Sequence, residues 1–218
     1  MDAVFRRRRL PHLDVAGGTY FVTAALAGSR PALGLARNRY RGPRSVARCS
    51  VASSAAASPP GWLTDRDAAA ERALDLEPLV RWLARDDLAT IVQAAILHGA
   101  GTRYDLLAYV VMPSHIHLVF TPFEDAANPT CRNERGRAAT PRQRILHSIR
   151  GYSARACNRL LGRSGEFWQR ECHDRWLRGP DEVRRAVEYV AFNPVAAGLC
   201  RRPEDWRFSS AWRCQGEP

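Results

Sequence analysis

The run of residues 106 to 120, LLAYVVMPSHIHLVF, constrains the fold more than any other segment. It is apolar almost throughout and ends at Thr121 and Pro122, so it predicts a buried β-strand. Two histidines, His115 and His117, interrupt it with a single isoleucine between them. Side chains two residues apart on a strand point to the same face, so we expect both imidazoles to project together while Ile116 points into the opposite layer.

Two imidazoles on one strand face allow two interpretations. They have a workable geometry for two ligands of one divalent ion, or for one phosphate, although the spacing does not name the ion. They are equally compatible with partly exposed strand histidines that make ordinary hydrogen bonds, because short motifs often occur without function. The choice between these interpretations depends on the rest of the chain.

The charge of the chain points to a polyanionic partner. The net charge is +11 and the pI about 10.2 over 218 residues, and all 33 basic residues are arginine. The positive electrostatic field of such a chain favours nucleic acid as the partner, with an acidic membrane surface second. The six cysteines include no CxxC pair, no apolar leader follows the first residues, and no run approaches the roughly 18 apolar residues of a membrane span. We therefore expect a soluble cytoplasmic protein.

Composition divides the chain into three parts. Residues 1–16 form a basic N-terminal arm, which carries four consecutive arginines, Arg6 to Arg9. Residues 17–178 form the core, interrupted at about 31–62 by an insertion rich in Ala, Ser, Pro and Arg that offers no core residues. Residues 179–218 form a C-terminal extension that is helical and rich in tryptophan.

Four further elements are expected from turn and capping signals. They are a strand in GGTYFVTAALAG from residue 17, one or two helices between Thr64 or Asp65 and Gly99, a helix from Thr140 and Pro141 to Gly162, and a helix from about Pro180 to Phe192 ended by Asn193 and Pro194.

The helix expected after Pro141 carries a tyrosine among arginines. Tyr152 shares a helical face with Ser148, Arg155 and Arg159. A phenol is a poor nucleophile at its usual pKa near 10, but positive neighbours favour the phenolate, and a phenol flanked by guanidinium groups can meet a phosphodiester. The alternative is that Tyr152 covers the core as an amphipathic aromatic side chain.

Four segments in this order resemble a known family. MPSHIHLVF, SIRGYSARACNRLLGRSGEFWQRECHDRWLR, YVAFNPVAAGL and PEDWRFSS are similar to the REP-associated tyrosine transposases, a branch of the single-tyrosine HUH transposases. The resemblance runs from residue 17 to residue 212, apart from the insertion. It implies an α+β fold with a ferredoxin-like or RRM-like antiparallel sheet, helices packed on one face, and the histidine pair on a central strand.

The resemblance also implies a reaction and a bacterial, nucleoid-associated protein. His115 and His117 would hold Mg²⁺ or Mn²⁺ against the scissile phosphate of single-stranded DNA, at a REP-like hairpin. Tyr152 would attack phosphorus to form a 5′-phosphotyrosine link, and a 3′-hydroxyl would later rejoin the strand. One alternative is a domesticated, inactive DNA-binding protein of the same fold. A metallohydrolase is a weaker alternative, because the other histidines form no series of ligands on separate strands.

DNA contacts are expected along the arginine-rich helix and the FWQR segment after it. Arginines would neutralise phosphates, and an exposed tryptophan would stack on a base, which contributes about 1–3 kcal/mol per base. The candidate residues are Arg150, Arg155, Arg159, Trp168, Gln169 and Arg170.

The chain departs from the family pattern at two places. Ser114 stands where the family usually has asparagine. Related enzymes complete the metal site with a polar residue one helical turn after the tyrosine, and after Tyr152 that position is Ala156. The third ligand therefore stays open, with Asn158, His173 and Asp174 as other possible neighbours. The sequence also leaves open whether the protein is a monomer or a homodimer, and whether the tyrosine serves its own chain or a neighbour's.

Overall fold

The computed structural model describes residues 3–7, 11–29, 74, 78–124 and 139–213. The insertion predicted at 31–62 and the helix start predicted at Thr64 or Asp65 lie outside these residues. In chain order the elements are β1 (Ala3–Arg7), β2 (Pro11–Val15), β3 (Thr19–Ala25), η1 (Trp82–Ala84), α2 (Asp86–Leu97), β4 (Tyr104–Val111), β5 (His115–Pro122), α3 (Pro141–Leu160), β6 (His173–Leu177), α4 (Pro180–Ala196) and η3 (Pro203–Asp205).

The centre of the fold is a four-stranded antiparallel sheet with the order β4-β5-β3-β6. From β3 to β6 the elements run β-α-β-β-α-β, which is the ferredoxin-like arrangement. The predicted α+β class is therefore confirmed. β1 and β2 pair with each other as a separate antiparallel hairpin. Part of the predicted N-terminal arm is therefore a β-hairpin.

The run LLAYVVMPSHIHLVF forms two strands, which corrects the single strand predicted for it. β4 ends at Val111 and β5 begins at His115, and the two pair as a hairpin around residues 112–114. Pro113 supplies no N–H to a ladder and Ser114 favours turns, which explains the break. The break places both histidines at the start of β5, beside the turn.

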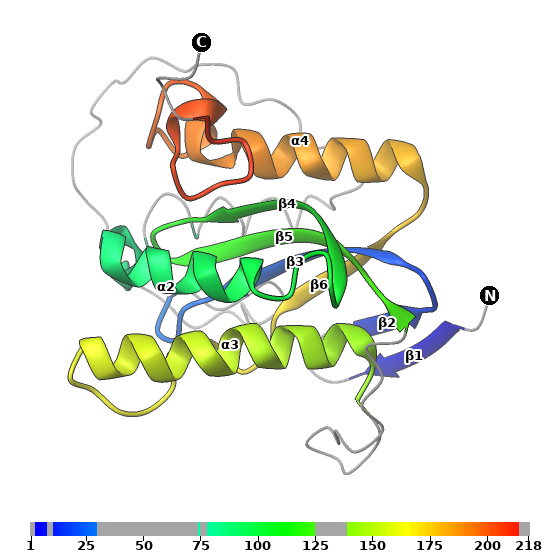
Figure 1. Cartoon of the computed structure of the whole chain (residues 1–218), viewed down its shortest axis with the longest axis horizontal. Coiled ribbons are helices and arrows are strands. Elements are labelled where there is room, and N and C mark those ends of the chain that lie inside the picture. The colour runs from blue at the N-terminus through cyan, green and yellow to red at the C-terminus, as the bar shows by residue number, and fades with distance from the viewer. Residues whose placement is uncertain (1–2, 8–10, 30–73, 75–77, 125–138, 214–218) are drawn as a thin grey trace, which may run out of the picture.

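Side chains along β5 alternate between two cores. Ile116, Leu118 and Phe120 belong to the larger core, which the sheet forms with α2 and α3. Val119 belongs to a smaller core that includes Ala186 and Val190 of α4. In Figure 1, α3 lies below the sheet and α4 above it. The resemblance implied helices on one face, so α4 on the opposite face is a correction that matters for the site.

The two long helices differ in how well their ends were predicted. α3 begins at Pro141 behind a capping box in which the Thr140 hydroxyl accepts from the Gln143 N–H, and Gly162 follows its end, as predicted. α4 was predicted to stop at Phe192 but continues through Asn193 and Pro194 to Ala196. A proline inside a helix removes one N–H, yet burial of Asn193 and Pro194 keeps this turn helical.

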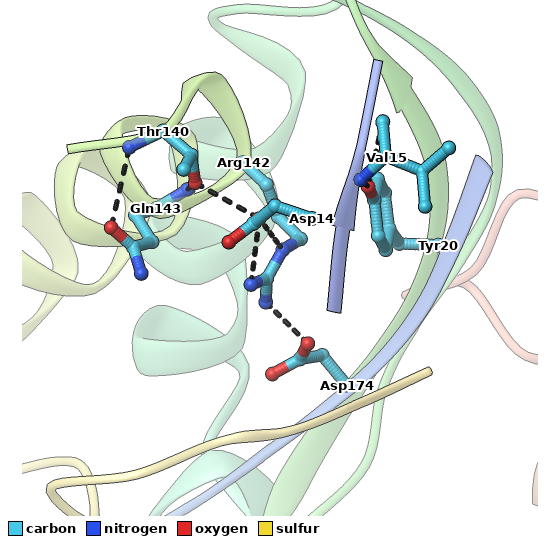
Figure 2. A network of polar contacts seen from close by, with 7 residues as sticks. All are labelled: Asp14, Val15, Tyr20, Thr140, Arg142, Gln143 and Asp174. Carbon is cyan, nitrogen blue, oxygen red and sulfur yellow. Dashed lines mark hydrogen bonds and ion pairs between the residues drawn. The ribbon is translucent and has the colours of Figure 1, made fainter. Parts of the chain in front are cut away.

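A buried ion network joins β2, α3 and β6 (Figure 2). The Arg142 guanidinium pairs with Asp14 Oδ1 at 2.8 Å and also with Asp174 of β6. Thr140 Oγ1 donates to the same Asp14 oxygen at 3.0 Å, and Arg142 lies 5.2 Å from the Tyr20 ring centroid. Burial alone would lower the pKa of Arg142, but the two carboxylates outweigh it and the pKa is raised. The network fixes the first turn of α3 against the sheet.

Candidate active site

The histidine pair lies on the face of the sheet that α4 covers. His115 Nε2 and His117 Nε2 are 3.0 Å apart, and both side chains are 0 % exposed. The predicted shared face is therefore confirmed. Burial beneath a helix was not predicted.

Each imidazole is oriented through its other nitrogen. Ser114 Oγ lies 2.9 Å from His115 Nδ1, and Thr23 Oγ1 lies 2.9 Å from His117 Nδ1. Ser114 donates its hydroxyl proton to the Leu74 carbonyl at 3.0 Å, so its oxygen accepts from the Nδ1–H of His115. The Nε2 of His115 therefore carries a lone pair. Metal-binding histidines typically make a hydrogen bond through one ring nitrogen, here Nδ1, and bind the metal through the lone pair of the other, here Nε2.

Burial keeps both imidazoles neutral. It lowers the pKa of His115 to about 3, and it lowers the pKa of His117 well below its usual value, with smaller contributions from the charges of His115 and His173. The neutral imidazole is the form that coordinates a metal ion. Because the Nε2 of His115 carries a lone pair, it accepts a hydrogen bond from the Nε2–H of His117 at 3.0 Å. The neutral pair can therefore act as two ligands once the His117 proton moves to Nδ1, beside Thr23 Oγ1.

The distance between the two nitrogens suits one ion. Two nitrogens bound at right angles, each about 2.1 Å from a metal, would lie about 3.0 Å apart. The described residues include no cluster of three His, Cys, Asp or Glu side chains that could hold a metal. Among the described residues, a third protein ligand would therefore have to be a side chain of another type, such as an amide.

Tyr189 on α4 packs against this pair. The His117 ring stacks on Phe21 with centroids 5.4 Å apart, and it meets Tyr189 edge to face at 5.8 Å. Phe21 and Tyr189 are themselves 5.8 Å apart at 75°. The three rings form one cluster between β3, β5 and α4, and Tyr189 is the tyrosine that the fold brings to the histidines.

Tyr152, the nucleophile predicted from the sequence, lies away from the histidines of its own chain. It belongs to α3, on the opposite face of the sheet, and it is 55 % exposed on the outer side of that helix. Buried Ile149, Ser153 and Cys157 take the inner side. Within one chain the sheet separates Tyr152 from the histidines. Tyr152 could therefore act only together with the histidines of another chain.

Asn193 is a polar residue one helical turn after a tyrosine, the position at which Tyr152 is followed by Ala156. It lies four residues, about one helical turn, after Tyr189 and is 3 % exposed. Its position on α4 is between Tyr189, which contacts His117, and Ala197, which lines a cavity together with His115. Its Oδ1 has no hydrogen-bond partner among the described residues. A buried amide oxygen of this kind is a suitable ligand for a hard cation.

Three of the residues predicted to contact DNA make hydrogen bonds within the fold. Trp168 is 5 % exposed and donates its Nε1–H to Ser153 Oγ at 3.0 Å, so it offers no stacking surface. Gln169 donates to the Ser29 carbonyl at 3.0 Å. Arg150 donates to the carbonyls of Gln169 and Arg170, which holds this loop against α3.

The remaining predicted contacts stay on the surface. Arg155 and Arg159 are exposed on α3, and the exposed Arg170 lies 3.2 Å from Glu166. Of the possible third ligands, Asn158 donates to the Gly165 carbonyl, and Asp174 pairs with Arg142. His173 pairs in register with Thr23, in the same row of the sheet as His117.

The sequence also held a signal that pointed to Tyr189. The segment EYVAFNP places an asparagine four residues after Tyr189, whereas Tyr152 is followed at the same distance by Ala156. The prediction preferred Tyr152 because of its arginines. Charge along a helix reports what the solvent-exposed side attracts, and it does not report which face of the sheet the helix covers.

Comparison with known proteins gives two related sequences. The chain is 26% identical over 110 residues to the Haemophilus influenzae protein named "Putative REP-associated tyrosine transposase", a match that covers 50% of this chain and 60% of that protein. It is 24% identical over 110 residues to the Escherichia coli REP-associated tyrosine transposase, with 50% and 56% covered. The match thus spans somewhat more than half the length of each relative. The similarity inferred from the four motifs is borne out.

One solved structure is also similar. It is a REP-associated tyrosine transposase bound to a REP hairpin, with a TM-score of 0.49 and 18% sequence identity, covering 90% of this chain and 78% of that one. No protein-family model matches the chain. Among the described helices, none is both long and apolar enough to cross a membrane.

Proposed function

We propose that this protein cleaves and rejoins single-stranded DNA at a REP-like hairpin, with Tyr189 as the nucleophile. The observation that carries the proposal is the contact of the Tyr189 ring with His117, one helical turn before the buried amide of Asn193. The names of the two related sequences and the net charge of +11 support DNA as the substrate.

In this reaction the Tyr189 oxygen attacks the scissile phosphorus and loses its proton to solvent. The bond from phosphorus to the 3′-oxygen breaks, the 3′-oxygen takes up a proton, and the 5′-phosphate stays on the tyrosine. A 3′-hydroxyl then attacks the phosphotyrosine and restores a phosphodiester, so the ester conserves the bond energy.

His115, His117 and the Asn193 amide oxygen would hold Mg²⁺ or Mn²⁺. A divalent ion bound there would supply positive charge against the non-bridging oxygens of the phosphate. Ser114 and Thr23 keep the imidazoles in the orientation that this requires. Burial keeps both rings neutral and ready to bind the ion.

The substrate needs a path to the histidines, because both are buried. We infer that the part of α4 that carries Tyr189 moves outward when DNA binds, since the Tyr189 ring covers His117, while the end of the helix at Ala197 keeps its place. A glycine with positive φ lies at each end of the helix, Gly179 at 105° and Gly198 at 69°. Such residues accept backbone rotation that other residues resist.

The experiment compares two tyrosines of one chain. The full-length protein is incubated with a labelled hairpin oligonucleotide carrying single-stranded flanks and Mn²⁺, and a protein–DNA adduct that survives denaturation is measured. We expect the adduct in the wild type and in Tyr152→Phe, and its loss in Tyr189→Phe. Loss in Tyr152→Phe alone would show that Tyr152 acts, in trans; mixing Tyr152→Phe with His117→Ala would then restore the adduct.

A second candidate function is DNA binding without cleavage. The complete burial of both histidines favours it, because a closed site reaches no phosphate. The same experiment separates the two functions: hairpin binding without an adduct under any divalent metal would support a domesticated DNA-binding protein and reject the transposase.

A further inference from the structure

A small cavity lies beside the histidine pair. Its volume is about 150 Å³, and it lies between the end of α4, the β4–β5 turn and the segment before η1. We propose that it binds one unpaired pyrimidine base of the DNA strand, next to the cleaved phosphate, and that Arg81 holds the phosphate of that nucleotide. The proposal rests on the proposed function, which places the scissile phosphate at His115 and His117.

The size of the cavity sets the size of the base. A dry cavity of about 150 Å³ accommodates a single six-membered aromatic ring. A pyrimidine therefore fits, whereas the two fused rings of a purine exceed the space. Six of the nine lining residues are apolar, so burying the faces of a base against them is favourable; they include Leu74, Met112, Pro113, Ala197 and Leu199.

The polar groups of the wall divide into two kinds. Ser114 and His115 are already hydrogen-bonded to each other, and Ser114 also to the Leu74 carbonyl. Arg81 is exposed and has no ion pair among the described residues. None of the described residues that line the cavity is acidic, so none of them opposes a phosphate at Arg81.

Selection by this cavity would depend on size. With Ser114 and His115 engaged and Arg81 on the phosphate, the other described side chains of the lining are apolar and do not read the edge of a base by hydrogen bonds. Cytosine and thymine should therefore bind alike. This separates the cavity from a site that reads sequence by hydrogen bonds.

The experiment is an abasic scan of binding by the full-length protein. The probe is a fluorescent DNA hairpin with an eight-nucleotide single-stranded tail, measured by anisotropy in EDTA so that cleavage does not contribute. We expect one tail position at which an abasic site weakens binding on the order of tenfold. Either pyrimidine should restore the affinity there, and a purine should not.

Two variants locate that position in the cavity. Ala197→Phe fills the cavity and should remove the effect of the abasic site. Ala196→Phe is the matched control, because Ala196 is exposed and does not line the cavity. Arg81→Gln should weaken binding and lower the salt slope by about one. Arg85→Gln removes the same charge from a side chain already paired with Asp87, so the slope should stay the same.

Two outcomes would overturn the proposal. One is a flat abasic scan with the wild type. The other is a sensitive position that persists in Ala197→Phe while thermal melting shows that variant to be folded. If Ala197→Phe does not fold, two other results decide whether the proposal holds. They are the preference for pyrimidines at the sensitive tail position and the lower salt slope of Arg81→Gln. An abasic effect without any covalent adduct would keep the cavity and reject the cleavage reaction, so the two proposals fail separately.

Discussion

Helices α3 and α4 each carry a tyrosine, but they lie on opposite faces of one sheet. On α3, Tyr152 points outward beside Arg155 and Arg159, while the inner side of the helix fills the larger core. On α4, Tyr189 points inward onto His117, with Asn193 buried one turn later. The α3 surface has the charge suited to DNA, and the α4 surface has the geometry suited to chemistry.

The difference between the two helices separates the attraction of DNA from a reaction with it. Exposed guanidinium groups raise the local concentration of a polyanion from either side of a protein. A reacting phosphate must touch the nucleophile and the ligands together, which only one face allows. Charge density therefore indicates a binding surface, and buried polar side chains that converge indicate a reaction site.

The largest effect on stability is expected at the base of α3. Arg142→Met leaves Asp14 and Asp174 buried without their cation, which should cost about 3–5 kcal/mol of unfolding free energy. Urea denaturation measures this loss. Arg144→Met, a buried arginine on the same helix with no ion pair to these carboxylates, is the comparison. An equal loss in both variants would show that the ion network has no special role.

Asn193→Leu should separate stability from activity on α4. It removes a buried amide whose oxygen lacks a partner, so the unfolding free energy should stay the same or rise by about 1 kcal/mol. Adduct formation should fall at least tenfold, because the variant removes the proposed third metal ligand. Asn158→Leu on α3 should leave adduct formation unchanged. Normal adduct formation in Asn193→Leu would exclude Asn193 as a ligand.

Acid should destabilise the α4 face through the histidines. The pKa of His115 is lowered in the folded protein, so its contribution to stability is complete above the unfolded pKa of about 6.5 and is lost as pH falls toward 3. At pH 5 the loss is about 2 kcal/mol from His115. Denaturation between pH 7.5 and pH 5, in EDTA, measures it. His115→Gln should show a shallower decline, and an unchanged decline would assign the effect to other groups.

The smallest effect is expected on the outer face of α3. Replacing Arg155 and Arg159 together with glutamine should lower the slope of log binding against log salt by about two, while bound DNA is cleaved at the same rate. Arg150→Gln is the matched comparison, because Arg150 bonds to loop carbonyls. It should reduce stability with little change in slope, and a slope change equal to that of an exposed arginine would place Arg150 on the DNA.

The sequence predicted what depends on neighbouring residues. The start of α3 follows from the Thr140 capping box and Pro141, and the shared face of His115 and His117 follows from strand periodicity. Predictions failed where distant contacts override local rules. Pro194 was expected to end a helix that burial continues, and Trp168 was expected to be exposed although Ser153 accepts its N–H inside the core.

The sequence by itself determined the histidine pair and the positive charge, because spacing acts locally and charge adds over the whole chain, and the resemblance of four motifs to a known family indicated the α+β class. The tertiary structure decided which tyrosine meets the histidines. α3 belongs to the crossover connection from β5 to β6, whereas α4 follows the last strand and packs on the other face, and no spacing along the chain records that choice. It also decided that an asparagine predicted to end a helix lies buried beside the candidate reaction site, because the side chains of β3 and β5 that pack under α4 come from distant parts of the chain.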